Sequence, residues 1–270
     1  MAVVTLISDW GDAGYYTAAV HGKLLNLLPD VVFVNITDKV PRHDLNYTAY
    51  VLSNARPNFP EGTIHIIAID SEENDIHSHV AVSYKNHFFI GADNGIFSLM
   101  FDETPDEVVS LSDILYDNLD ATTFPERDRF AKVAAMIAEG KKLSEIGPPF
   151  ELKTELVPFK PTSGKTDIEG MVVFIDGYEN LVTNIHRSLF QQVIRNNSFE
   201  IHLKGYHINK ISDTYSDVPE SSLVAFFGSN GYLQIALNRS KAHSLLNIGI
   251  NDKVVIEIKK PGEDTSPSMF

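Results

Sequence analysis

The sequence of 270 residues contains no cysteine. That absence excludes disulfide bonds, thiolate zinc sites, iron–sulfur clusters and cysteine nucleophiles. Basic residues are also scarce, because 22 Lys and Arg stand against 36 Asp and Glu, for a formal net charge of −14. Nucleic-acid phosphates and anionic membrane surfaces both attract basic protein faces, so we expect neither as a partner.

Long apolar runs are absent as well. No stretch approaches the ~20 apolar residues of a membrane-spanning helix. The N-terminus meets Asp9 before any signal-peptide pattern develops. Generic motifs for a P-loop, a dinucleotide-binding glycine loop, a nucleophile elbow and a zinc protease are also missing. We therefore expect a soluble, cytoplasmic protein.

The first part of the chain alternates buried strands with amphipathic helices. Runs of β-branched residues predict strands at Val3–Ile7, Val31–Ile36 and Thr63–Ile69. Helical spacing of apolar residues predicts helices at Tyr15–Leu28, Asp44–Ala55 and Arg127–Glu139. A hairpin is predicted at His79–Tyr84 and His87–Ala92. Such alternation is typical of a Rossmann-like, layered α/β domain with a mostly parallel sheet, which we place at residues 1–160.

The character of the sequence then changes. Proline and glycine accumulate at about residues 148–168, which indicates a linker. Short strands punctuated by glycine follow, so we predict a β-barrel domain at residues 169–260 and a disordered tail at 261–270. Residues 1–160 carry 12 basic and 24 acidic residues, which places −12 of the net charge in the first domain.

Polar residues follow two of the predicted strands, where α/β sheets place their ligands. Asp9 follows the first strand and suits a ribose diol or a metal, or forms a simple Asx turn. Asp70 opens a loop that holds three further carboxylates, His77 and His79. This loop is either a solvated acidic segment or a metal site built from His77, His79 and Asp70 or Asp75.

Two more motifs stand out. Glu126 and Asp128 precede the alanine-rich helix and suit its positive N-terminus, whereas Arg127 opposes that dipole and hints at a specific partner. In the second domain, an aromatic residue (Tyr178) lies near two asparagines, Asn180 and Asn184, which offers adenine a stacking face and amide groups. Turn-forming asparagines are the alternative there.

The order of motifs along the chain resembles that of the S-adenosyl-L-methionine (SAM) hydroxide adenosyltransferase family, which is related to fluorinases and chlorinases. The resemblance extends from Val3 to about Ile258 and rests on the motifs SDWG, VPRHD, FPEGTIH, DNG, TFPERD, KLSEIG, IDGYENLVTNIHR and GSNGYLQIALN. It implies an α/β domain plus a β-barrel, and a homotrimer that binds SAM between subunits. It also implies that SAM is a substrate and that neither a cofactor nor a metal is needed.

The resemblance assigns roles to individual residues. Asp70 matches a catalytic aspartate, Asp9 would hold the ribose hydroxyls, and Phe124 belongs to the matching Thr-Phe pair. In the second domain, Tyr178 and Tyr215 would flank the adenine and Asn180 would bind its edge. The remaining binding residues are Asp176 and Ser229, for the methionine ammonium, and Asn238, which would line the pocket.

The chain departs from the family pattern elsewhere. The glycine-rich stretch after Asp70 is replaced by residues 71–74, and a ribose-side aspartate falls on Gly14. A family arginine aligns with His77, a family histidine aligns with Pro125, and a ring-stacking aromatic becomes His43. We expect His77, beside Asp70, to replace the arginine as the catalytic cation. The sequence therefore predicts an enzyme in which water attacks the ribose C5′ of SAM. A weak or inactive SAM- or adenosine-binding homologue, or an enzyme for another adenosine-containing ligand, is the alternative. Halogenation is disfavoured because Glu72, Glu73 and Glu126 would repel a halide.

Overall fold

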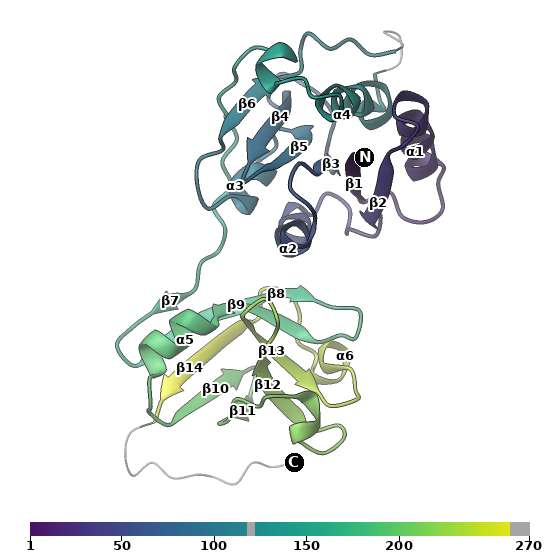
Figure 1. The fold of residues 1–270 in the computed structure, drawn as a ribbon. Coiled ribbons are helices and arrows are strands. Elements are labelled where there is room, and N and C mark those ends of the chain that lie inside the picture. The colour runs from purple at the N-terminus through teal and green to yellow at the C-terminus, as the bar shows by residue number, and fades with distance from the viewer. Residues whose placement is uncertain (118–121, 260–270) are drawn as a thin grey trace. The chain divides into compact units, whose positions relative to one another are not determined.

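The computed structural model describes residues 1–117 and 122–259, and the chain divides into two units, Met1–Pro158 and Phe159–Phe270 (Figure 1). Each unit has its own hydrophobic core. The tail that we expect to be disordered lies outside the described residues. Within those residues, no helix is long and apolar enough to cross a membrane.

The first unit is built around a six-stranded sheet in the order β2-β1-β3-β5-β4-β6. Its strands are β1 (Val3–Ser8), β2 (Val32–Thr37), β3 (Ile64–Ala68), β4 (His79–Tyr84), β5 (His87–Ala92) and β6 (Glu107–Ser110). Strands β2, β1, β3 and β5 run parallel, whereas β4 is antiparallel to both its neighbours. The mostly parallel sheet and the predicted β4–β5 hairpin are thereby confirmed.

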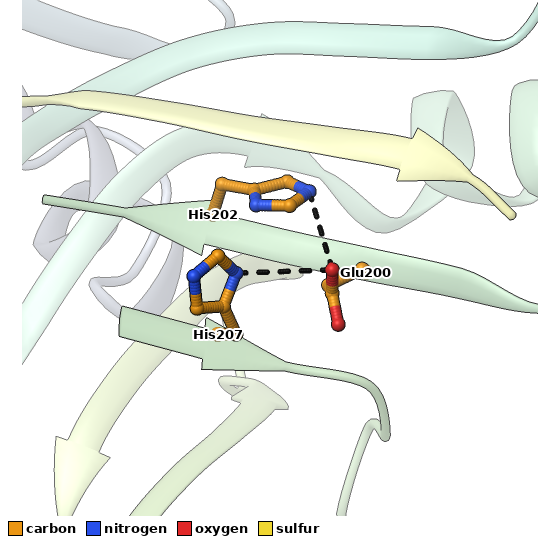
Figure 2. A group of neighbouring side chains, drawn as sticks. All are labelled: Glu200, His202 and His207. Carbon is orange, nitrogen blue, oxygen red and sulfur yellow. Dashed lines mark ion pairs between the residues drawn. The ribbon is translucent and has the colours of Figure 1, made fainter. Parts of the chain in front are cut away.

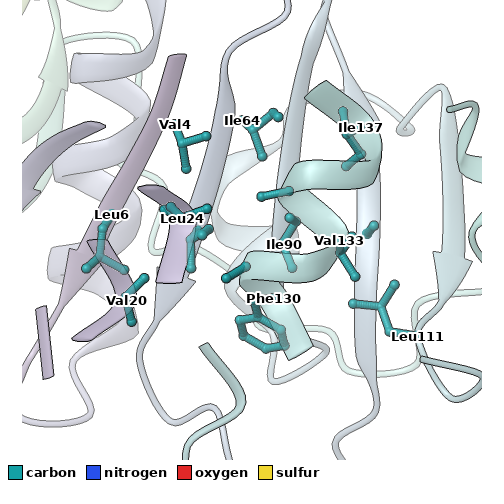
Figure 3. Packing of buried hydrophobic residues seen from close by; sticks show 14 of the residues in the cluster. Val4, Leu6, Val20, Leu24, Ile64, Ile90, Leu111, Phe130, Val133 and Ile137 are labelled. Carbon is teal, nitrogen blue, oxygen red and sulfur yellow. The ribbon is translucent and has the colours of Figure 1, made fainter. Parts of the chain in front are cut away.

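Helices cover both faces of this sheet. They are α1 (Tyr16–Leu27), α2 (Leu45–Ala55), α3 (Ile96–Met100) and α4 (Ala131–Ala138), with 3-10 turns at Arg56–Asn58 and Leu143–Glu145. Alternate residues of β3 point to opposite faces, so Ile64 (Figure 3) and Ile66 pack with α1 and α4, while Ile67 packs with α2 and α3. The strands are therefore buried on both faces, as their apolar runs predict.

Two local features of the first unit differ from what the sequence predicts. The helix predicted from Arg127 begins as a π-helical segment, Glu126–Phe130, before α4. Residues after Gly147 lie against the first unit, because Phe150 and Leu152 pack on its core and the carboxylate of Asp93 accepts a hydrogen bond from the Lys153 amide at 2.7 Å.

The second unit is an antiparallel β-barrel-like sheet in the order β11-β10-β14-β8-β9-β13-β12, with β7 paired to β8. This confirms the predicted β-barrel. The strands are β7 (Thr162–Ser163), β8 (Asp167–Ile175), β9 (Leu181–His186), β10 (Phe199–Leu203), β11 (Tyr206–Ile208), β12 (Leu223–Phe227), β13 (Tyr232–Leu237) and β14 (Lys253–Ile258). Its helical segments are α5 (Arg187–Ile194), α6 (Ala242–Leu246) and a 3-10 turn at Tyr215–Asp217.

Candidate functional site

Three parallel strands of the first unit end at one edge of the sheet. Asp9 follows β1, Asp70 follows β3 by two residues, and Asp93 and Asn94 follow β5. Because β1, β3 and β5 are consecutive neighbours, these polar residues lie side by side at the carboxyl edge.

Asp9, His43 and Asp70 form one group at this edge. A carboxylate oxygen of Asp9 accepts a hydrogen bond from the main-chain N–H of His43 at 2.9 Å, and Nδ1 of His43 lies 3.6 Å from a carboxylate oxygen of Asp70. His43 and Asp70 both adopt positive φ angles, of 58° and 46°. Such left-handed backbone is unfavourable for residues with a Cβ and is concentrated at functional sites.

The backbone of Asp70 is held in place by the Asp-Asn-Gly motif. The buried Asn94 side chain donates hydrogen bonds to the carbonyls of Ile69 at 2.9 Å and Asp70 at 3.1 Å. Its oxygen accepts a hydrogen bond from the Ile96 amide at 3.2 Å, at the start of α3. Asn94 therefore supports the strained conformation in which Asp70 projects from the sheet edge.

Glu126 is a buried carboxylate whose role the sequence motifs did not indicate. It belongs to the π-helical segment, is only 2% exposed, and accepts a hydrogen bond from the hydroxyl of Ser71, the residue after Asp70. Burial raises the pKa of Glu126 to about 7, against the lowering effect of the Ser71 bond, and the nearby charges of Asp9 and Asp128 raise it further. A buried carboxyl that titrates near neutrality is suited to proton transfer.

A buried ionic network lies beside Glu126. The guanidinium of Arg129 contacts a carboxylate oxygen of Glu73 at 2.7 Å and Nδ1 of His79 at 3.1 Å. Nε2 of His79 donates to the carbonyl of Ser71, 2.7 Å away. Burial and the Arg129 charge lower the pKa of His79 despite the opposing effects of Ser71 and Glu73. Both ring nitrogens of this neutral His79 are engaged, so the metal site considered for His77 and His79 is not formed.

Phe124 lies in an aromatic cluster in front of the π-helical segment. Its ring is 8% exposed and meets the rings of Trp10 and Tyr16 edge-on, with centroids 5.6 and 5.3 Å away. The guanidinium of Arg127 lies 4.9 Å from the Phe124 ring and pairs with the carboxylate of Asp128 at 2.5 Å. Arg127 therefore has its specific partner within the chain.

His77 lies on the same loop as Asp70 but is less firmly placed. Its main-chain N–H bonds to the side-chain oxygen of Asn74 at 2.8 Å, and its carbonyl accepts from the Asn74 amide at 3.1 Å. Across residues 1–117 and 122–259, no hydrogen bond or ion pair involves the His77 imidazole. The imidazole that the structure brings to Asp70 is that of His43.

The second unit contains a pocket of about 660 Å³ that collects four of the predicted binding residues. Tyr178, Asn180, Tyr215 and Asn238 all line it. Asn180 and Asn238 are buried, whereas Tyr178 is 82% and Tyr215 41% exposed. The pocket thus combines aromatic faces with amide groups, as recognition of a purine requires.

Asp176 holds the turn that carries two of the pocket residues, Tyr178 and Asn180. One of its carboxylate oxygens accepts hydrogen bonds from the amides of Tyr178 and Asn180, at 2.9 and 2.8 Å, and the other accepts from the Asn180 side chain at 2.9 Å. The Asn180 side chain also reaches the hydroxyl of Tyr215 at 3.3 Å. Part of the role of Asp176 is therefore to shape the turn between β8 and β9.

Ser229 does not join this group. It lies in the loop between β12 and β13, next to the register pair Phe227–Leu233, whereas the pocket lies by the other end of that hairpin, at Leu237 and Asn238. Ser229 is exposed. Any ligand contact that it makes is separate from the pocket around Asn180.

Two family sequence patterns match most of the chain. That of the SAM hydroxide adenosyltransferase N-terminal domain matches residues 4–147, and that of the C-terminal domain of the same family matches residues 170–255. The chain belongs to the SAM hydroxide adenosyltransferase family. This is an enzyme family, as the sequence predicts.

Relatives of known name match most of the chain. (R)-S-adenosyl-L-methionine hydrolase from Thermus thermophilus is 28% identical over 258 residues, which cover 92% of this chain and 96% of the relative. The protein of the same name from Salinispora arenicola is 29% identical, with coverage of 93% and 96%. A conserved protein from Thermotoga maritima shares the fold, with a TM-score of 0.86 at 23% identity over 94% of this chain and 99% of that chain.

The sequence singled out Glu126 without predicting its proton-transfer role, and it did not point to Arg129 at all. Both were visible only as part of the charged run before the alanine-rich helix. What distinguishes them from ordinary surface charges is their burial, since a buried charge needs a partner. Their partners, Ser71 and Glu73, lie in the loop after β3 and become evident only in three dimensions.

Proposed function

We propose that this protein cleaves SAM by attack of water on the ribose C5′ carbon, with adenosine and L-methionine as products. The observation that carries the proposal is the group of three carboxylates, Asp9, Asp70 and Glu126, at the carboxyl edge of the first unit's sheet. SAM carries a cationic sulfonium, and an anionic site attracts it. A halide nucleophile would be repelled by the same charges.

The reaction balances without a cofactor. The water oxygen forms a bond to C5′, the C5′–sulfur bond breaks, and sulfur keeps the electron pair as it becomes the neutral thioether of methionine. This leaving group needs no proton. The enzyme has to position water in line with the C5′–sulfur bond and take up one proton.

Glu126 and Asp70 share this task in our proposal. Asp70, held by Asn94 and adjacent to His43, orients the water. Glu126, linked to the Asp70 loop through Ser71, takes up the proton. Glu126 thereby supplies the function that the family histidine, absent at Pro125, would otherwise perform. Asp9 binds the ribose hydroxyls.

His77 remains a proposed catalytic cation, and a variant tests it. If the loop closes on bound SAM, the His77 imidazole approaches Asp70 and the His77→Ala variant loses at least ~10²-fold in turnover, as for loss of a proton-transfer group. Unchanged turnover would exclude His77 from catalysis without excluding hydrolysis. His21→Ala, a histidine on α1, is the matched control.

The second unit supplies the adenine site in this proposal. Tyr178 and Tyr215 stack on the base, and Asn180 and Asn238 bind its edge through their amides. The resemblance implies that Asp176 and Ser229 both bind the methionine ammonium, but Ser229 lies at the other end of the β12–β13 hairpin, so we propose Asp176 alone for this role. We propose a homotrimer in which the first unit of one subunit and the second unit of its neighbour complete each site. The proposed reaction needs no cofactor, and we expect it to take place in the cytoplasm.

Incubation of the purified protein with excess SAM tests this function. Adenosine and methionine should appear in equal amounts over many turnovers, and calorimetry should detect binding of adenosine. Binding without products would instead identify a ligand-binding homologue. If neither SAM nor adenosine binds, the pocket assignment fails.

A further inference from the structure

Three side chains of the second unit converge on one face of the barrel sheet (Figure 2). They are Glu200 and His202 of β10 and His207 of β11. One potential ligand atom from each lies within 4.8 Å of the other two. None of the three belongs to the pocket or to the carboxylate edge described above.

The local sequence explains this convergence. Glu200 and His202 are two residues apart in a strand, so their side chains point to the same face. His207 is the direct partner of His202 in the β10–β11 register. The two strands are joined at Lys204 and Gly205, which adopt positive φ angles of 48° and 87° as in a tight hairpin turn. The hairpin therefore fixes the relative positions of the three groups.

The spacing of these groups fits a small metal ion. Nε2 of His202 and Nδ1 of His207 each lie 3.7 Å from the same carboxylate oxygen of Glu200, Oε2. Ligand atoms bound tetrahedrally at ~2.0–2.1 Å are about 3.4 Å apart, so the two distances to Glu200 are a few tenths of an ångström longer than a bound ion requires. The two histidine nitrogens lie within 4.8 Å of each other, so the imidazoles would have to move closer together around the ion. Two imidazoles and a carboxylate are typical zinc ligands.

The neighbouring charges leave one carboxylate oxygen of Glu200, Oε2, available to bind a metal. Lys259 contacts the other Glu200 oxygen, Oε1, at 3.0 Å. Partial burial opposes ionisation of Glu200, but the bond and charge of Lys259 and the two histidines lower its pKa overall, so the carboxylate is ionised at neutral pH. Oε2 of Glu257 on β14 lies 3.6 Å from Nε2 of His202 and adds a further negative charge on that side of the group.

We propose that Glu200, His202 and His207 bind a divalent metal ion of the zinc class. The ion would fasten β11, the edge strand of the sheet, to β10. This departs from our expectation that the protein holds no metal. The site is independent of SAM hydrolysis, because its residues have no part in the proposed reaction.

Zinc titration of the full-length protein, after treatment with a chelator, tests the site. Calorimetry at pH 7.5 should show one Zn²⁺ bound per chain, and the thermal unfolding temperature should rise by about 2 °C or more. His202→Asn and His207→Asn should each lower the affinity by more than the ~10–100-fold typical for loss of an outer partner of a ligand. His21→Asn should bind zinc as the wild type does.

Three further measurements test the site if a histidine variant folds poorly. Affinity in the wild type should fall in acidic solution, because imidazole must be neutral to bind a metal. Co²⁺ should give the visible absorption of a tetrahedral site, and Lys259→Met should raise affinity. No zinc binding, or binding unaffected by both asparagine variants, would show that the cluster is an ion-pair group only.

Discussion

The hydroxyl of Ser71 donates a hydrogen bond to the carboxylate of Glu126 across 55 residues of sequence. This bond joins the loop after β3, which carries Asp70, to the π-helical segment before α4. Irregular π-helical turns are frequent at functional sites, and this one buries Glu126 and Arg129 together. A carboxyl with a raised pKa therefore lies next to the aspartate that the family resemblance identifies as catalytic.

Replacement of Glu126 by glutamine should remove the proton acceptor and keep the shape of the side chain. We expect kcat to fall by ~10²–10⁴, the usual contribution of general acid–base catalysis. Wild-type kcat/KM should rise with pH up to about 7 and then level off, because the base must be deprotonated. The variant should lose this rise. Glu139→Gln, at the exposed end of α4, is the control, and an unchanged pH profile for Glu126→Gln would exclude Glu126 as the base.

The same substitution should change the pH dependence of stability. The folded-state pKa of Glu126 is raised from 4.5 to about 7, so its contribution to stability is fully present below pH 4.5 and is lost as the pH rises through about 7. At ~1.4 kcal/mol per pKa unit, the full loss is about 3 kcal/mol. Denaturant unfolding should find Glu126→Gln more stable than wild type at pH 8 by a few kcal/mol, with a much smaller difference at pH 5. Equal differences at both pH values would contradict the buried-carboxyl account.

Asp70 should show a conflict between stability and activity. Its φ of 46° is unfavourable for aspartate, and glycine adopts such angles freely. We expect Asp70→Gly to be as stable as wild type or more stable by about 1 kcal/mol, yet inactive. Asp70→Asn, which tolerates left-handed backbone, should retain wild-type stability and also be inactive. Substantial turnover by either variant would separate Asp70 from the reaction.

Tyr215 should contribute mainly through its ring. Base stacking on an aromatic side chain is worth ~1–3 kcal/mol, so Tyr215→Ala should weaken adenosine binding by about 10-fold or more. Tyr215→Phe retains the ring and loses only the contact between its hydroxyl and Asn180, so its affinity should stay within a few-fold of wild type. Calorimetry with adenosine measures both. Equal losses in the two variants would assign the binding to the hydroxyl instead.

The two-unit architecture could be predicted because the strands of the two units have different patterns. Continuous apolar runs such as Ile64–Ala68 indicate strands covered on both faces, and short strands punctuated by glycine indicate a barrel. Asp44 was recognisable as an N-cap, and its side chain accepts the Tyr47 amide at 2.8 Å. The strand β9 and the helix α5 were not predicted. The strand runs directly into the helix at His186 and Arg187, and no turn residue marks the boundary.

The sequence allowed prediction of those site residues that lie in family motifs or directly after the parallel strands. The edge positions of Asp9 and Asp70 follow from the parallel strands that precede them. The network of Glu73, His79 and Arg129 depends on side chains buried by tertiary packing, which charge patterns along the chain do not reveal. For the same reason the sequence favours His77 as the neighbour of Asp70, whereas the structure brings His43 to it.

Hydrolysis of SAM in ¹⁸O-labelled water tests the central claim most directly. Mass spectrometry of the products should find one label in the 5′-hydroxyl of adenosine and none in methionine, since water attacks C5′ and sulfur only departs. Unlabelled adenosine, or label in another product, would contradict attack at C5′. Failure to form adenosine at all, under conditions where SAM binds, would contradict hydrolysis itself.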